Sequence, residues 1–256
     1  MKTISNYIIS SLIILSLAGC KHKKNDDSAN ANGTLAFHLH TLVGDTEVDD
    51  YNTNYTLSNG RTISVSKAQL YISNIQLVKL DGTLYNVSGV DILKVQEIEE
   101  ITVGTVPAGN YKSVRFTVGL DSTTNHTTPA NSNTTLNHTD MWFGSTVQPD
   151  GFIFVNFQGM IDTTTAADMS SPMQPFSYKI GTDANKKQVS MPDKNFTITP
   201  NSIGMVHIVI DYSQLFNGIT LNNQNNLVLA NASDNATALG ILVKNNIPSM
   251  FQYEEE

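Results

Sequence analysis

The sequence contains little cysteine and little charge. Of its 256 residues, one is a cysteine and 15% are charged. A single thiol excludes an internal disulfide framework, and it also excludes a zinc site built from several cysteines. The scarcity of charge argues against long exposed helices, because these need Lys, Arg and Glu on their solvent faces.

Basic clusters and catalytic motifs are also missing. The formal net charge is −8 and no extended basic block occurs, so the chain lacks the cationic footprint that nucleic acid requires. There is no Gly-x-Ser-x-Gly elbow, no His-Glu-x-x-His zinc motif, no phosphate loop and no dinucleotide fingerprint. We therefore expect a protein that is not an enzyme and does not bind nucleic acid.

The first residues have the pattern of an export signal. Met1-Lys2 precedes a short apolar run that ends in LSLAGC, too short to cross a membrane as a helix. This ending resembles the bacterial lipobox, which implies a signal peptide over 1–19 and a lipidated (palmitate-carrying) Cys20. Residues 21–33 lack apolar periodicity, so 20–33 is expected to be a flexible tether. The prediction is a lipoprotein of the bacterial cell envelope, anchored in the outer membrane and facing the periplasm or the surface.

The rest of the chain, 34–256, is expected to form a single domain. Short alternating or β-branched runs separated by turn residues predict an all-β fold, an antiparallel β-sandwich with long loops and one or two short helices. Short helices are expected at 212–217 and 235–244, and the polar stretch 121–139 is expected to be a long surface loop. The expected strands are 34–42, 61–65, 69–80, 83–93, 111–119, 151–159, 177–181, 196–198 and 202–212.

The histidines are the candidate metal ligands. His38 and His40 are two positions apart in a predicted strand, so both point to one face. His207 lies in another predicted strand and could supply a third ligand if the two strands are neighbours. The alternatives remain open: His38 and His40 could simply form a solvent face, and a lone histidine in an apolar strand is more often a core residue.

His138 and Trp142 are further candidate metal ligands. His138 precedes Trp142 by four residues, which suits a metal site close to the tryptophan, although exposed loop histidines are common. Trp142 is also compatible with a core or edge aromatic. The acidic loop around Glu47 and the acidic end around Glu254 are expected to be solvated.

Five segments taken together resemble the MbnP-like family of periplasmic or membrane-anchored β-sandwich proteins, which is related to the copper-binding proteins MopE and CorA. The resemblance covers most of 34–253. The segments are LYISNIQLVKLDGTLY (70–85), VPAGNYKSVRFTVGLDSTTN (106–125), MWFG…GFIFVNFQG (141–159), FSYKIGT (176–182) and VHIVIDYSQLF (206–216).

The resemblance implies copper binding or delivery outside the cytoplasm. In some members a tryptophan is oxidised to kynurenine by a separate dihaem enzyme, and kynurenine with imidazoles suits copper. The implied copper ligands are His38, His40, His207, His138 and Trp142. The sequence departs from the family pattern at two places. Trp142 stands one position before the usual tryptophan, and Lys179 occupies a position where histidine is frequent.

A second hypothesis stays open at this point. The chain could be a surface binding or scaffold module that kept the sandwich and lost the metal. Such a module would hold a glycan or a protein through Asn/Thr-rich loops and exposed aromatics such as Tyr51, Tyr55 and Phe143.

Overall fold

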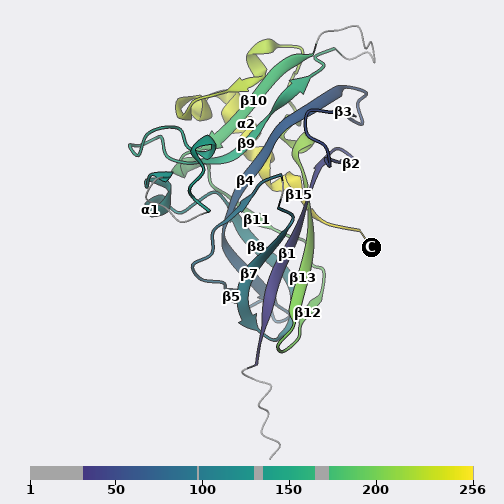
Figure 1. Cartoon of the computed structure of the whole chain (residues 1–256), viewed down its shortest axis with the longest axis vertical. Helices are drawn as coiled ribbons and strands as arrows, with labels where there is room; N and C mark the ends of the chain where they lie inside the picture. The colour runs from purple at the N-terminus through teal and green to yellow at the C-terminus, as the bar shows by residue number, and fades with distance from the viewer. Residues whose placement is uncertain (1–30, 97, 130–134, 165–172, 256) are drawn as a thin grey trace, which may run out of the picture.

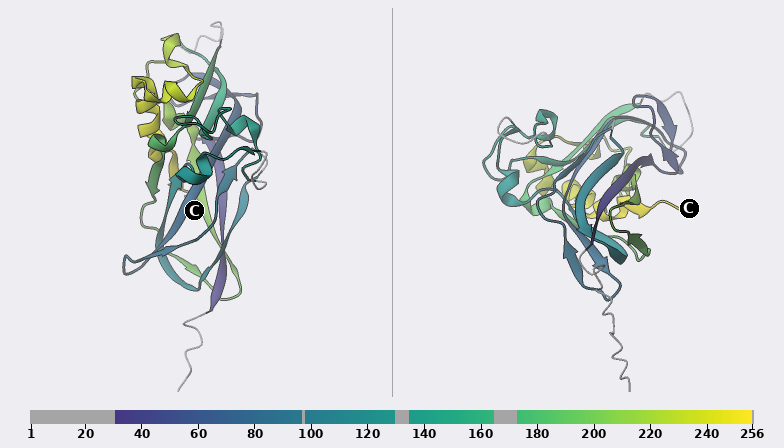
Figure 2. Two further views of the ribbon diagram at one scale, coloured as in Figure 1. Left: turned by 90° about the vertical axis from the view of Figure 1, so that its left-hand side faces the viewer. Right: turned by 60° about the horizontal axis from the view of Figure 1, so that its bottom comes forward.

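The computed structural model describes residues 31–96, 98–129, 135–164 and 173–255. The predicted signal peptide, Cys20 and the tether as far as residue 30 lie outside the described residues. The described chain forms two packed β-sheets, so the predicted β-sandwich is confirmed (Figure 1). Other views show helical pieces gathered at one end of the sandwich (Figure 2).

The smaller sheet carries the two strands on which the candidate histidines lie. Its strand order is β15-β13-β1-β2, and β7 also pairs with β1. The bounds are β1 (Asn32–Val43), β2 (Thr46–Glu47), β7 (Glu100–Pro107), β13 (Ile203–Asp211) and β15 (Phe251–Tyr253).

The larger sheet forms the opposite layer. Its main path is β11-β8-β4-β9-β10-β14, and β3, β5, β6 and β12 pair at its margins. The bounds are β3 (Asn54–Thr56), β4 (Thr62–Lys79), β5 (Leu84–Asn86), β6 (Ile92–Lys94), β8 (Gly109–Val118), β9 (Ile153–Ile161), β10 (Gln174–Gly181), β11 (Lys187–Ser190), β12 (Phe196–Ile198) and β14 (Val228–Leu229).

Strand β1 pairs with β13 in parallel, which differs from the expected antiparallel arrangement. β10 and β14 also run parallel, so both sheets are mixed. Parallel strands need a long crossover between them, and here every strand of the larger sheet except β14 lies between β1 and β13 in the sequence. Turn signals in the sequence indicate only which consecutive strands form hairpins, so they could not predict the pairing of β1 with β13.

The predicted strands differ from the observed ones at several places. The strand expected at 83–93 is two short strands, β5 and β6, and the short strands β2, β3, β11, β14 and β15 were not expected. The two strands expected at 61–65 and 69–80 are one 18-residue strand, β4. Its pairing with β8 and β9 shifts register at several points, so β4 contains local irregularities. Asn74 adopts φ 50° at one of them, a conformation that asparagine tolerates better than most residues. Strand β7 was not expected, yet it brings Glu99 and Glu100 beside β1.

Both short helical regions were predicted approximately where they occur. The segment expected at 212–217 is a 3-10 helix, η5 (Tyr212–Phe216), and the segment expected at 235–244 is divided between η7 (Ala232–Ala236) and α2 (Ala238–Asn246). The side chain of Thr237 caps α2 by accepting a hydrogen bond from the Gly240 amide. The remaining short helices are α1 (Ser122–Asn125), η3 (Thr139–Met141), η4 (Asp183–Asn185), η6 (Gln224–Asn226) and η8 (Ile247–Met250).

The polar stretch 121–139 is more ordered than a plain surface loop where it is described. It begins with α1, and Asn125 is fully buried. Asp183 accepts hydrogen bonds from Ser122, Asn125 and Gln148. Partial burial raises the pKa of the Asp183 carboxyl, but these hydrogen bonds and the nearby His126 outweigh it and hold the pKa at about 2. His126 is thus part of a structural network.

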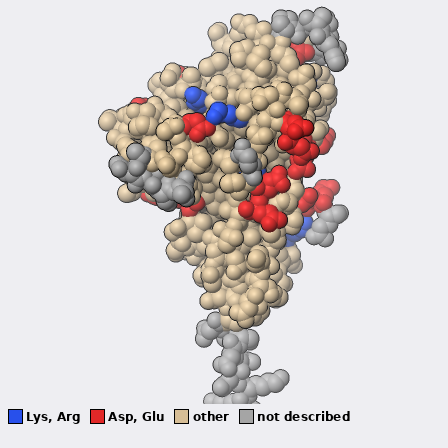
Figure 3. Space-filling model, in the orientation of Figure 1, with Lys and Arg blue, Asp and Glu red and all other residues tan. Residues whose placement is uncertain are grey.

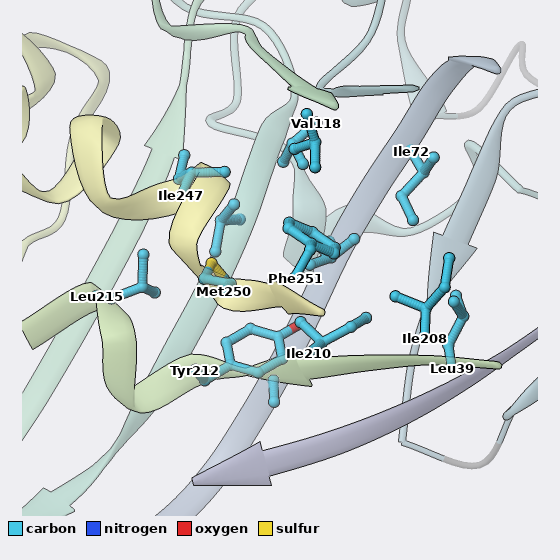
Figure 4. Close-up of a cluster of buried hydrophobic side chains, with 14 of the residues drawn as sticks. Leu39, Ile72, Val118, Ile208, Ile210, Tyr212, Leu215, Ile247, Met250 and Phe251 are labelled. Atoms are coloured by element: carbon cyan, nitrogen blue, oxygen red, sulfur yellow. The ribbon is translucent and has the colours of Figure 1, made fainter. Parts of the chain in front are cut away.

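The core lies between the sheets and continues under the C-terminal segment. In β1, Leu35, Phe37 and Leu39 are fully buried, as the alternation of the strand predicts. Figure 4 shows Ile247, Met250 and Phe251 of the C-terminal segment packed over residues of β13 and η5. The strands that carry the histidines therefore rest on a dense apolar layer.

An aromatic cluster joins the larger sheet to the end of β13. The ring of Phe157 lies 4.8 Å from Phe176, 5.1 Å from Tyr212 and 5.6 Å from Phe216 between centroids. Such pairs add to the free energy gained by burying the rings themselves.

Replacing Phe157 by alanine should therefore destabilise the whole domain. We expect Phe157→Ala to lower the free energy of unfolding by about 3–5 kcal/mol, because it removes a fully buried ring. Met160→Ala, on the same strand but 39% exposed, should change it by no more than about 0.5 kcal/mol. Urea denaturation measures both. Equal losses in the two variants would contradict the assignment of the core.

Candidate metal centre

Three imidazoles meet on the outer face of the smaller sheet. The register of β1 and β13 places His38 directly opposite His207, and His40 follows on the same face. The ring centroids of His38 lie 4.1 Å from His40 and 5.0 Å from His207. The condition set by the sequence, that the two strands be neighbours, is met.

Glu254 completes a group of four possible ligands. It follows β15 and its amide donates a hydrogen bond to the carbonyl of His207. One ligand atom from each of the four residues lies within 4.8 Å of the other three. The Nδ1 atoms of His38 and His207 are 3.2 Å apart, and Oε2 of Glu254 is 3.0 Å from His207 Nδ1.

These separations match those around one metal ion. Two ligand atoms that each lie about 2.0–2.1 Å from a tetrahedral ion are separated by about 3.3 Å. The third separation, between His40 Nε2 and Glu254 Oε2, is 3.5 Å. The remaining separations are within 4.8 Å, so the four atoms are grouped closely enough to surround one transition-metal ion after adjustment of the side chains.

Two carboxylates outside the group orient its histidines. Oε1 of Glu47 lies 2.6 Å from His40 Nδ1, and Oε2 of Glu99 lies 3.6 Å from His38 Nε2. Each carboxylate faces the ring nitrogen that points away from the other ligands. Metal-binding histidines are commonly held this way, because the outer hydrogen bond fixes both the ring orientation and the tautomer.

The site contains an unpartnered polar atom that a metal would satisfy. His40 Nε2 is buried and has no hydrogen-bond partner. A buried ring nitrogen without a partner is costly, and metal coordination removes that cost. Acidic side chains gather on this side of the molecule, at the right in Figure 3, which favours the approach of cations.

The other two predicted ligands, His138 and Trp142, lie outside this group. His138 precedes η3 and lines a separate cavity with Leu93 and Ile101. Trp142 forms a β-bridge with Phe152 and packs against a second apolar cluster beside the larger sheet. Their role as ligands stays a prediction, and the structure brings together only the three strand histidines.

Sequence reasoning missed the carboxylates. Glu47 and Glu254 were expected to be solvated, but both contact the histidines. Glu254 directly follows β15, whose Tyr253 pairs with Ile208, so Glu254 lies beside His207. This position depends on a pairing of distant strands, which has no local signal in the sequence. The aromatics Tyr51, Tyr55 and Phe143 were expected to be exposed. They are half-buried against the apolar clusters, because their rings cover core residues.

Comparison with known proteins places the fold. Within the described ranges, no helix has the length and apolar character needed to span a bilayer. No curated protein sequence matches the chain. A solved structure, MbnP from Methylosinus trichosporium, is similar with a TM-score of 0.53 and 15% identity, over 73% of this chain and 78% of that chain. The family model for MbnP matches residues 32–232. The chain therefore belongs to the MbnP family, which is extracytoplasmic.

Proposed function

We propose that this protein is a non-enzymatic carrier that binds copper outside the cytoplasm and delivers it to a partner. The observation that carries the proposal is the group of four ligand atoms, from His38, His40, His207 and Glu254, on one face of a rigid sheet. Imidazole ligands suit copper, zinc, iron and nickel, whereas magnesium and calcium prefer oxygen. The family resemblance favours copper among these metals.

The exposure of the ligands suits transfer rather than permanent storage. The side chains of His38 and His40 are 20% and 14% exposed, whereas those of His207 and Glu254 are 47% and 43% exposed. A metal ion would therefore be held by the enclosed histidines His38 and His40 and would be accessible to solvent on the side of His207 and Glu254. A partner's ligands can displace the exposed pair first, which allows stepwise exchange.

This arrangement does not require a modified tryptophan. The family resemblance implies oxidation of Trp142 by a dihaem partner, but Trp142 packs in the second apolar cluster and the four ligands form a group without it. Oxidation of Trp142 is therefore not needed to complete the group of four ligands. We propose that copper binds the unmodified chain.

The location follows from the proposed lipid anchor. Acylation of Cys20 would hold the domain at the outer membrane by burial of acyl chains. Strand β1 begins at Asn32, so the chain from Cys20 to β1 can span at most about 40 Å. The anchor would therefore keep the domain close to the membrane.

Replacing His40 tests the ligand assignment. We expect His40→Ala to weaken copper binding by more than about 100-fold, beyond the 10–100-fold typical of outer-sphere changes, because it removes a ligand. His138→Ala should bind copper like the unmodified chain. Isothermal titration of both variants measures the difference, and thermal unfolding checks that each is folded. Loss of copper only in His138→Ala would contradict the proposed site.

Replacing Glu47 tests the orienting contact. Glu47→Gln should weaken copper binding by about 10–100-fold, because the carboxylate that fixes the ring of His40 loses its charge. Asp45→Asn changes an exposed carboxylate in the turn between β1 and β2 and serves as the matched control. Competition with a chromophoric copper chelator measures both affinities. Equal affinity in the two variants would show that Glu47 has no orienting role.

Replacing Cys20 tests the anchor. Cys20→Ser removes the thiol that accepts the lipid, so we expect the chain to leave the membrane fraction for the soluble fraction. Mass spectrometry of the chain with Cys20 intact should show acyl groups on its N-terminal peptide. If Cys20→Ser stayed in the membrane fraction, some other attachment would hold the protein there.

A further inference from the structure

A cavity opens directly beside the metal-binding group. It has a volume of about 420 Å³ and shares His207 and Glu254 with that group. β15 pairs with β13 only at Ile208–Ile210, so the edge of β13 before His207 is open to the cavity. Lys194 Nζ donates a hydrogen bond to the carbonyl of Glu254 and keeps the cavity wall in place.

Met205 lines the same cavity and lies two positions before His207 on β13. Alternate residues of a strand share one face and their Cα atoms lie about 6.5–7 Å apart. Across the β1–β13 ladder the neighbour of Met205 is Ala36, a small side chain that is itself buried. The three rotatable bonds of methionine let its sulfur turn toward the ring of His207.

Met205 is set apart from the other described methionines. Met141, Met191 and Met250 are buried in the core, Met160 is exposed on the larger sheet, and Met173 is half-buried just before β10 of that sheet. The domain itself holds no cysteine, because the single cysteine of the chain is Cys20. A thioether is therefore the soft ligand available to this site, and soft sulfur ligands select copper(I).

We propose that Met205 supplies its thioether sulfur to copper on the cavity side of the histidine group and thereby makes the site prefer copper(I). This inference rests on the proposed function. His38 and His40 hold the ion from β1, and Met205 adds a sulfur ligand where the site opens to the cavity. Copper(II), which prefers nitrogen and oxygen ligands, gains little from the sulfur.

The test compares Met205→Leu with Met160→Leu in the full chain, purified in detergent. Leucine keeps the apolar volume and removes the sulfur, and thermal unfolding confirms that both variants are folded. Anaerobic titration with copper(I) against a chromophoric chelator is the first measurement, and titration with copper(II) is the second. X-ray absorption at the copper edge detects whether a sulfur atom is bound to the ion.

We expect Met205→Leu to bind copper(I) about tenfold more weakly or worse, to bind copper(II) within about twofold of the unmodified chain, and to lose the sulfur signal. Met160→Leu should match the unmodified chain in all three. If the unmodified chain binds copper(I) without a sulfur signal, or if Met205→Leu keeps full copper(I) affinity, Met205 is not a ligand although the histidine site stands. If the unmodified chain binds neither oxidation state, or if His40→Ala binds both undiminished, the proposed function fails as well.

Discussion

The parallel pairing of β1 with β13 is the constraint on which the candidate site depends. It places His38 against His207, residues 169 positions apart in the sequence, and it fixes which face of each strand looks outward. A slip of one residue would turn His207 toward the core and bring Val206 or Ile208 out. The apolar residues that alternate with the histidines prevent that slip, because burying them sets the register. The grouping of the three histidines is thus specified by the core beneath it.

The sequence was informative wherever a pattern is local. Alternation in FHLH indicated that His38 and His40 share a face, and alternating runs with turn residues indicated a sandwich. Pairing between distant strands leaves no such local mark, so the contact of β1 with β13 stayed a condition and its parallel direction was missed. Glu254 was missed for the same reason, since its role depends on β15 returning to β13. Acidic residues near chain ends are usually solvated, and nothing in three glutamates marks one of them as a ligand.

The site combines a rigid inner side with a more open outer side. His38 and His40 lie on a strand whose reverse face is fully buried, so their backbone cannot shift without disturbing the core. Glu47 lies on β2 and Glu99 directly precedes β7, the two strands that pair with the edge of β1 opposite β13, and each carboxylate lies beside one of the two rings. His207 and Glu254 are less confined. The more enclosed histidines lie on β1, whereas the more exposed pair comes from β13 and from the segment after β15.

The position of Glu254 gives a bound ion a mechanical role. β15 contributes three paired residues to the edge of the smaller sheet, a short contact for the strand that holds the chain end in place. An ion shared by β1, β13 and Glu254 would cross-link that edge of the sheet and close a very long loop of chain. Loss of the ion would remove this cross-link, so the C-terminal segment and the wall of the adjacent cavity would become more mobile together. Cargo release and partner access would then be two aspects of one local opening.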